Sequence, residues 1–138
     1  MRRQSGFTLI EILVVVMILG LLISLAAPRI MGRTDEARVV KAKADIKALE
    51  QALNLYRLDS GVYPTTEQGL AALVEEPRTG EPPRNYRSEG YMERLPLDPW
   101  NREFLYASDG KTYTLQSLGA DGQEGGEGID ADLDAREF

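Results

Sequence analysis

The chain has 138 residues, a formal net charge of −6 at pH 7, and neither histidine nor cysteine. This length suits one modest domain with an additional terminal element, and the acidic charge argues against a nucleic-acid partner. The lack of cysteine excludes a disulfide framework. Because the chain also lacks the commonest general base and the commonest transition-metal ligand, we expect a protein that is not an enzyme.

An apolar segment occupies residues 7–27 and follows Arg2 and Arg3. As a helix it would be roughly 32 Å long, close to the thickness of the hydrocarbon core of a bilayer. The pattern allows a secretory signal peptide, a plain membrane anchor, or an anchor that is processed at its N-terminus. Small residues before Pro28 favour the first, but the segment is longer than the apolar region of a usual signal peptide, and the helical pattern continues beyond Pro28.

Glu11 is an anomaly in this apolar segment, because a carboxylate within a bilayer costs about 2–4 kcal/mol on insertion scales. One interpretation is that its side chain reaches the nearby headgroups, since Glu11 lies close to the end of the segment. The other is that Glu11 pairs with a positive charge, because an unpaired buried charge is far costlier than a paired one. The residues alone leave both interpretations open.

Residues 6–11, Gly-Phe-Thr-Leu-Ile-Glu, lie between a short basic leader and the long apolar segment. This arrangement resembles the N-terminal signature of type IV pilins and pseudopilins. The resemblance implies that a prepilin peptidase cuts the chain after Gly6 and methylates the new amine of Phe7. It also implies that Glu11 neutralises the Phe7 amine of a neighbouring subunit and so sets the register of assembly.

The same resemblance implies how the chain is organised. Residues 1–6 form a leader peptide, residues 7–28 a membrane-spanning helix that becomes the filament core, and residues 29–138 a periplasmic domain whose amphipathic helical half ends at about residue 59. Basic residues flank the apolar segment on both sides, so the positive-inside rule does not decide the orientation. The cytoplasmic N-terminus, the periplasmic C-terminal domain and the single pass through a bacterial inner membrane therefore rest on the resemblance alone.

Beyond Pro28, apolar residues recur at intervals of three and four, which predicts that an amphipathic helix continues. Pro28 removes one hydrogen bond from this helix and clashes with the preceding turn, so we predict a kink or a locally melted segment between Gly20 and Gly32. Gly61 is expected to end the helix. The apolar stripe consists of Val39, Ala42, Ile46, Leu49, Leu53 and Tyr56.

The remaining residues predict a short helix and a small sheet. Thr65 and Gln68 fit a capping box, which favours a helix that runs to about Glu75. Its inward side chains would be Leu70, Leu73 and Val74. Strands are predicted at residues 104–107 and 112–117, on either side of the tight-turn dipeptide Asp109-Gly110, and a third short strand is expected at residues 91–95. The fold class is therefore α+β, a long N-terminal helix packed on a small antiparallel sheet, and the resemblance implies the pilin-like version of it.

Asp98-Pro99-Trp100 resembles an Asp-Pro-Trp turn in the globular domain of the same family. The next residue there is usually glycine, whereas this chain has Asn101, which also tolerates a left-handed backbone conformation. We expect Trp100 to be a core residue and Asp98 to cap the turn.

Residues 118–132 are dense in carboxylates and glycines, and oxygen ligands on a bendable backbone suit calcium. Asp121 begins a stretch of EF-hand length, but Gln123 and Gly125 are poor ligands at their places and no helices flank the loop. We therefore reject an EF-hand, and a solvated acidic loop stays open as the alternative to a calcium site.

Residues 117–122, Ser-Leu-Gly-Ala-Asp-Gly, resemble a motif of the major pseudopilins, type G, of the type II or general secretion pathway. In that family the loop folds around one calcium ion. The resemblance implies that Asp121, Asp130 and Asp132 supply side-chain oxygens and that Leu118 supplies its backbone carbonyl. Glu124 and Glu127 are reserve ligands.

The resemblance implies a structural function as the repeating subunit of a secretion pseudopilus in the periplasm. The expected partners are other copies of the chain, a prepilin peptidase, minor pseudopilins, an inner-membrane assembly platform, and membrane lipid before assembly, but no nucleic acid. A type IV pilin for adhesion or motility is an alternative, although such pilins usually carry a disulfide loop and this chain has no cysteine. A secreted calcium-binding protein with a cleaved signal peptide is the other alternative.

The mature N-terminus distinguishes these alternatives. Mass spectrometry of the mature protein should find a chain that begins with methylated Phe7, because the peptidase acts after Gly6. A chain that begins at Ala27 or Pro28 would instead support the secreted protein and contradict the pilin-like processing.

Overall fold

The fold is that of a computed structural model, which describes residues 7–81 and 83–138 and, within residues 25–33, the backbone only. The chain divides into two compact units, residues 1–35 and residues 36–138. The predicted leader, residues 1–6, and the predicted cleavage after Gly6 lie outside the described residues.

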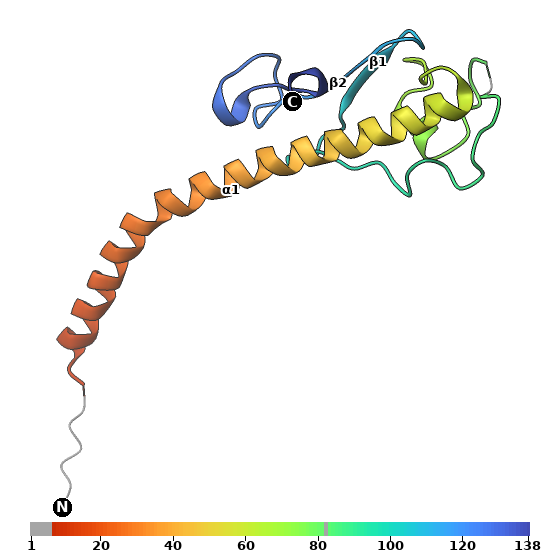
Figure 1. Cartoon of the computed structure of the whole chain (residues 1–138). Helices are drawn as coiled ribbons and strands as arrows, with labels where there is room; N and C mark the ends of the chain where they lie inside the picture. Colours follow the sequence, from red (N-terminus) through yellow and green to blue (C-terminus); the bar gives the residue numbers. More distant parts are fainter. Residues whose placement is uncertain (1–6, 82) are drawn as a thin grey trace, which may run out of the picture. The chain divides into compact units, whose positions relative to one another are not determined.

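A single helix, α1 (Leu9–Ser60), contains 52 residues and crosses from the first unit into the second (Figure 1). It is helical through Gly20 and Gly32, so the predicted locally melted segment is not found. The kink at Pro28 stays a prediction, since the Pro28 side chain lies outside the described part. Gly61 ends α1 as predicted: its φ is 84°, and its amide donates to the carbonyl of Arg57 at 2.7 Å.

The first unit presents apolar side chains to its surroundings. Within the described residues, the large apolar side chains from Phe7 to Ile23 are exposed. No helix in the described part of the chain is both long enough and apolar enough to cross a membrane.

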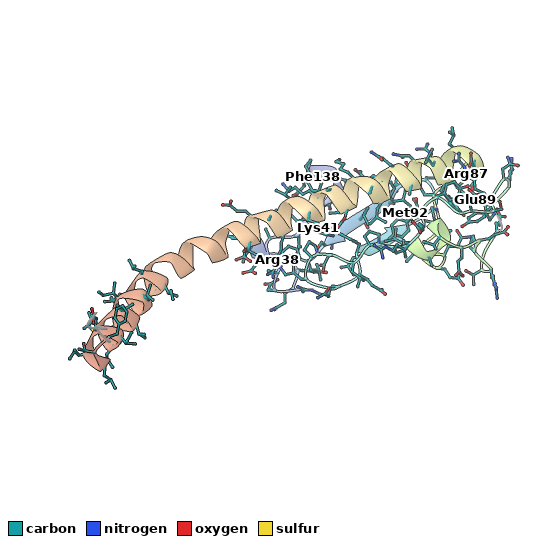
Figure 2. The ribbon with its side chains drawn as sticks, turned by 90° about the horizontal axis from the view of Figure 1, so that it is seen from below. Arg38, Lys41, Arg87, Glu89, Met92 and Phe138 are labelled. Carbon is teal, nitrogen blue, oxygen red and sulfur yellow. The ribbon has the colours of Figure 1, made fainter. Side chains whose placement is uncertain are left out.

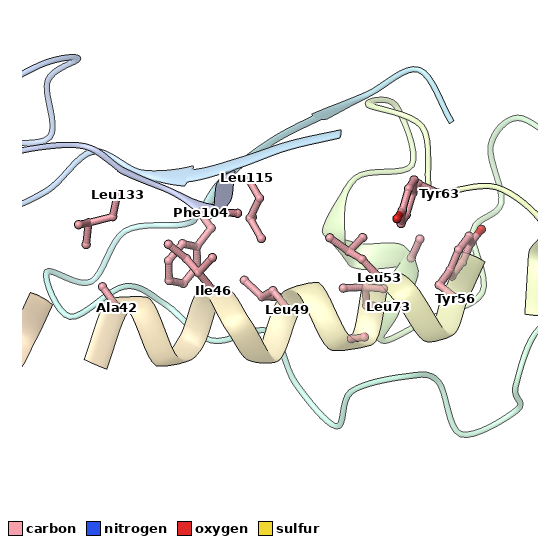
Figure 3. Packing of buried hydrophobic residues seen from close by; sticks show 13 residues of the cluster. Ala42, Ile46, Leu49, Leu53, Tyr56, Tyr63, Leu73, Phe104, Leu115 and Leu133 are labelled. Carbon is pink, nitrogen blue, oxygen red and sulfur yellow. The ribbon is translucent and has the colours of Figure 1, made fainter. Parts of the chain in front are cut away.

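The core of the second unit forms where the apolar stripe of α1 meets the rest of the domain (Figure 3). The side chains of Ile46, Leu49 and Leu53 are fully buried, and Val39 is half-buried at the edge. This packing confirms the predicted stripe. Its partners from beyond α1 include Tyr63, Leu73, Phe104, Leu115 and Leu133.

A capping box forms at residues 65–68, but the helix after it is shorter than predicted. The Thr65 amide donates to Oε1 of Gln68 at 3.0 Å, and the Gln68 amide donates to Oγ1 of Thr65 at 3.3 Å. Gly69 then adopts a φ of 61° and interrupts the turn. The chain continues as a 3₁₀ helix, η1 (Leu70–Leu73), so the prediction of a helix to Glu75 is wrong. Leu73 is buried as predicted, whereas Leu70 and Val74 are half-buried.

Three antiparallel strands form the sheet in the order β1-β2-β3. The hairpin of β1 (Leu105–Ser108) and β2 (Tyr113–Ser117) lies where the sequence predicts it. Its turn is held by Asp109, whose Oδ1 accepts hydrogen bonds from the amides of Lys111 and Thr112 at 2.9 and 2.7 Å. These amide donors lower the pKa of Asp109 below its usual value.

The third strand is not where the sequence predicts it. β3 is Leu133–Asp134, which pairs with the end of β2, and it is too short to show an alternating pattern. Residues 91–95 are irregular instead. The Tyr91 and Met92 amides both donate to the Leu73 carbonyl, at 2.7 and 3.0 Å, so they are not available to a strand partner.

The irregular segment around Tyr91 is attached to the end of α1. The ring of Tyr91 lies 5.3 Å from that of Tyr56 and 5.4 Å from that of Tyr86, measured between centroids. Arg87 and Asp59 form an ion pair at 2.6 Å. Figure 2 shows Arg87 near the end of the helix and Met92 farther back along it. The apolar residues that suggested a strand therefore pack as a loop on α1.

Candidate functional site

Glu11 begins α1 together with Thr8. The Glu11 amide donates to Oγ1 of Thr8 at 3.3 Å, and the Thr8 amide donates to Oε2 of Glu11 at 3.4 Å. This is a capping box, which satisfies amides that the first turn of a helix leaves without partners. This second role of Glu11 was not predicted from the sequence, although a threonine three residues before a glutamate is the usual signal of a capping box.

The other predicted residues of the N-terminal segment are only partly described. The side chain of Phe7 is 80% exposed. Gly6 and the side chain of Pro28 lie outside the described residues. The pairing of Glu11 with the Phe7 amine of another subunit therefore stays a prediction.

The acidic loop between β2 and β3 is closed by backbone contacts between its two arms. The Ala120 amide of the first arm, residues 119–122, donates to the Ile129 carbonyl of the second arm, residues 129–132, at 2.9 Å. The Gly122 amide donates to the Leu118 carbonyl at 3.1 Å and so turns the first arm back on its own start. Gly119 has a φ of 61°, and a β-carbon there would lie 2.6 Å from the carbonyl oxygen of Asp130. Only glycine allows the two arms to approach this closely.

The predicted calcium ligands lie around this loop but are not gathered. Oδ1 of Asp121 accepts from the Gln123 amide at 3.0 Å, and Oδ2 of Asp132 accepts from the Gly125 amide at 2.9 Å. Oδ1 of Asp132 is buried and has no hydrogen-bond partner among the described residues. Asp130 is half-buried. Among the residues that the structure describes, no group of three or more Asp, Glu, His or Cys side chains could hold a metal ion.

Asp98 fixes the turn that precedes the sheet. Its Oδ1 accepts from the amides of Trp100 and Arg102 at 3.0 and 2.8 Å, and its Oδ2 accepts from Oγ of Ser117 at 2.9 Å. Asp98 is 3% exposed, so its carboxylate is buried, and both of its oxygens accept hydrogen bonds. It caps the turn as predicted. Asn101 has a φ of 64°, and Trp100 packs, half-buried, against the core.

Arg102 connects this turn to the acidic loop. Its Nη2 donates to the carbonyls of Gly119 and Ala120 at 2.9 and 2.6 Å. A β-carbon at Gly122 would overlap Nη1 of Arg102, so the backbone of the loop passes directly against the guanidinium. Arg102 was not predicted from the sequence, because a contact across 17 residues between two irregular segments has no local sequence signal.

Beyond the acidic loop, cationic side chains bind the C-terminal residues of the chain. Arg136 donates to both carboxylate oxygens of Asp134 in β3, and these hydrogen bonds lower the pKa of Asp134. The ring of Phe138 lies 4.9 Å from Nζ of Lys43 and 5.1 Å from Nζ of Lys47, measured to its centroid. These contacts attach the end of the chain to α1 (Figure 2).

Comparisons with known proteins match both parts of this arrangement. Residues 29–136 match a family described as type II secretion system (T2SS), protein G, and residues 1–27 match a prokaryotic N-terminal methylation motif. The chain belongs to the type II secretion system protein G family. It is a major pseudopilin with an N-terminal methylation motif and is a structural, non-enzymatic protein.

Relatives of this major pseudopilin match over nearly their whole length. The type II secretion system core protein G of Vibrio cholerae serotype O1 is 55% identical over 135 residues, which cover 96% of this chain and 92% of the relative. That of Pseudomonas aeruginosa is 52% identical over 134 residues, which cover 96% of this chain and 94% of the relative.

A solved structure matches the fold. The crystal structure of the major pseudopilin from the type 2 secretion system of enterohaemorrhagic Escherichia coli has a TM-score of 0.66 at 43% identity, and the match covers 75% of this chain and 87% of that one. The predicted family and the α+β, pilin-like fold are thus confirmed. The type IV pilin and the secreted calcium-binding protein are not supported by these matches.

The close approach of the two loop arms gives a stability prediction for this pseudopilin. Gly119→Ala and Gly128→Ala both place a side chain at positive φ, 61° and 66°, but a β-carbon meets nothing within 4 Å at position 128. The conformation alone costs about 1–2 kcal/mol. Thermal unfolding should therefore show a modest loss for Gly128→Ala and a clearly larger one for Gly119→Ala. Equal losses would contradict the role of the close contact.

Proposed function

We propose that this major pseudopilin polymerises at the inner membrane into a helical pseudopilus whose growth drives protein export across the outer membrane. The observation that carries the proposal is the methylation motif at residues 1–27, a stretch that includes the start of α1. A subunit that repeats the same head-to-tail contact forms an open helical filament rather than a closed ring. The exposed apolar side chains from Phe7 to Ile23 would be covered by lipid before assembly and by other subunits afterwards.

The capping box of Glu11 suggests how a subunit waits for its partner. In the single chain, Oε2 of Glu11 accepts one long hydrogen bond, 3.4 Å, from the Thr8 amide. A methylated Phe7 ammonium of a neighbouring subunit would offer a full positive charge to this carboxylate, whereas the Thr8 amide offers only a dipole, so the ammonium would be the stronger partner. The exchange of the weaker partner for the stronger would place an incoming subunit in one register.

The remaining parts of this proposal follow from processing and membership of the secretion system. We expect a prepilin peptidase to cut after Gly6 and methylate Phe7, and we expect minor pseudopilins and an inner-membrane assembly platform to be partners. A helix from residues 7–28 would cross the inner membrane once, with the N-terminus in the cytoplasm and residues 29–138 in the periplasm.

Substitution of Glu11 tests the assembly role. Glu11→Ala should leave cleavage and methylation intact, as judged by mass spectrometry, while electron microscopy finds few or no filaments. Glu11→Gln is the matched variant, because glutamine preserves a capping box but carries no charge. It should fail to form filaments as well, since an uncharged amide cannot neutralise an ammonium. Normal filaments in either variant would refute the charge-pairing role.

We propose in addition that the acidic loop binds one calcium ion through Asp121, Asp130, Asp132 and the Leu118 carbonyl. The donors are hard oxygens, as calcium requires, and Oδ1 of Asp132 is a buried oxygen that lacks a hydrogen-bond partner among the described residues. The contact of Gly119 with Asp130 already joins the two arms that carry these donors. Calcium would supply the positive charge that draws the carboxylates together.

Thermal unfolding with and without calcium tests this site. Ligand at about 100 times its Kd stabilises the native state by about 2.7 kcal/mol, so the melting temperature should rise when calcium is added. Asp121→Ala should lose most of this rise, and Glu89→Ala, which removes an exposed carboxylate outside the loop, should retain it. An unchanged calcium response in Asp121→Ala would eliminate Asp121 as a ligand.

A further inference from the structure

We infer that Arg102, which lies outside the acidic loop, holds the first arm of that loop, residues 119–122, in place before any metal binds. Arg102 is thereby a positioning residue for the calcium site. The second half of this inference rests on the proposed calcium function. The first half concerns the metal-free chain alone.

The loop needs a cation from outside itself. Residues 118–132 contain five carboxylates and neither lysine nor arginine. Like charges in such a segment repel one another, and they favour an expanded loop over a closed one. Arg136 is engaged by Asp134 at the far end. Arg102 is the cation that reaches the first arm.

The Arg102 guanidinium donates hydrogen bonds to backbone carbonyl oxygens of the first arm. One nitrogen, Nη2, donates to two successive carbonyls, of Gly119 at 2.9 Å and of Ala120 at 2.6 Å. No ion pair with a carboxylate accompanies these contacts among the described residues, so the guanidinium binds the backbone of an acidic loop rather than its side chains. The absence of a side chain at Gly122 leaves room for Nη1.

The root of the Arg102 side chain is fixed. The Arg102 amide donates to Oδ1 of Asp98, and its carbonyl accepts from the Asp98 amide, both at 2.8 Å. The other carboxylate oxygen of Asp98 accepts from Ser117, the residue directly before the loop. The guanidinium therefore extends from a backbone that is bonded to the start of the same loop, which lowers the entropy lost when it binds the carbonyls.

The first arm in turn positions the second. Ala120, whose carbonyl binds Arg102, donates its amide to Ile129 at 2.9 Å. Gly119, the other residue bound by Arg102, lies against the carbonyls of Asp130 and Ala131. Arg102 thus acts on the placement of residues 129–131, which include Asp130, through two residues of the first arm.

The positioning role of Arg102 and its electrostatic repulsion of a metal ion predict opposite changes in calcium affinity when its side chain is removed. As a nearby positive charge, the guanidinium repels a metal ion, and its removal would then tighten binding. As a positioning residue, Arg102 reduces the conformational entropy that the loop loses when calcium binds, and its removal would weaken binding. Because Arg102 makes two carbonyl contacts, at 2.9 and 2.6 Å, we expect the positioning effect to outweigh the repulsion.

Amide hydrogen exchange of the full mature chain in detergent, with a chelator present, tests the first half. Arg102→Ala should accelerate exchange of the Ala120 and Gly122 amides by about ten-fold or more, because hydrogen bonds to a charged group are lost. The amides of β2 should be unaffected. Arg102→Lys, which keeps the charge but not the planar fork, should give a smaller effect, and it serves if the alanine variant does not fold. Arg78→Ala, an exposed arginine outside the loop, is the control for net charge.

Unchanged exchange at Ala120 and Gly122 would overturn the inference, as would an equal acceleration throughout β2, which indicates general destabilisation. Calorimetric titration of the same proteins with calcium chloride tests the second half. Calcium should bind Arg102→Ala about ten-fold more weakly than wild type or Arg78→Ala, and tighter binding would overturn the positioning role. If wild type binds no calcium, the proposed calcium site fails, while the exchange measurement still decides whether Arg102 braces the loop.

Discussion

Burial of the α1 stripe is the interaction on which the second unit depends. Ala42, Ile46 and Leu49 are 0% exposed, and they belong to one buried cluster with residues such as Leu73 in η1, Leu115 in β2 and Leu133 in β3. Burying a large aliphatic side chain contributes about 1.5–3 kcal/mol. Because β3 has two residues, most of the sheet is a two-stranded hairpin, which is at best marginally stable alone. The helix therefore supplies the apolar surface on which the hairpin and the irregular segment around Tyr91 pack.

Irregular segments in this domain are held by buried or half-buried polar side chains rather than by regular backbone pairing. Asp98 illustrates the reason. A buried carboxylate is costly unless its oxygens are occupied, and here two amides and the Ser117 hydroxyl occupy them. Because the same side chain bonds the turn and the end of β2, it fixes where the acidic loop begins. The acidic loop thus starts from a turn that Asp98 holds in place, although the loop contains little secondary structure of its own.

The features that the sequence predicted correctly are those with local signals. The spacing of three and four residues gave the buried face of α1, and Asp109-Gly110 gave the hairpin. The strand predicted at residues 91–95 was wrong because the ring of Tyr91 packs on Tyr56 and the amides of Tyr91 and Met92 both bond the Leu73 carbonyl. β3 was missed because two residues cannot show a period. At the candidate site, the loop and its carboxylates were visible, but Arg102 was not, since its contacts depend on how two loops meet in space.

Glu11 and the acidic loop share a physical logic. Each contains groups that are costly when left alone, a carboxylate in an apolar helix and carboxylates crowded on one loop. In the single chain each has a modest local partner: the Thr8 amide at 3.4 Å for Glu11, and Arg102 for the loop carbonyls. A local partner keeps the monomer ordered without satisfying the group completely. Under the proposed function, a stronger external cation, an ammonium in one case and a calcium ion in the other, would still bind with a net gain, and assembly and calcium binding would then depend on the arrival of that partner.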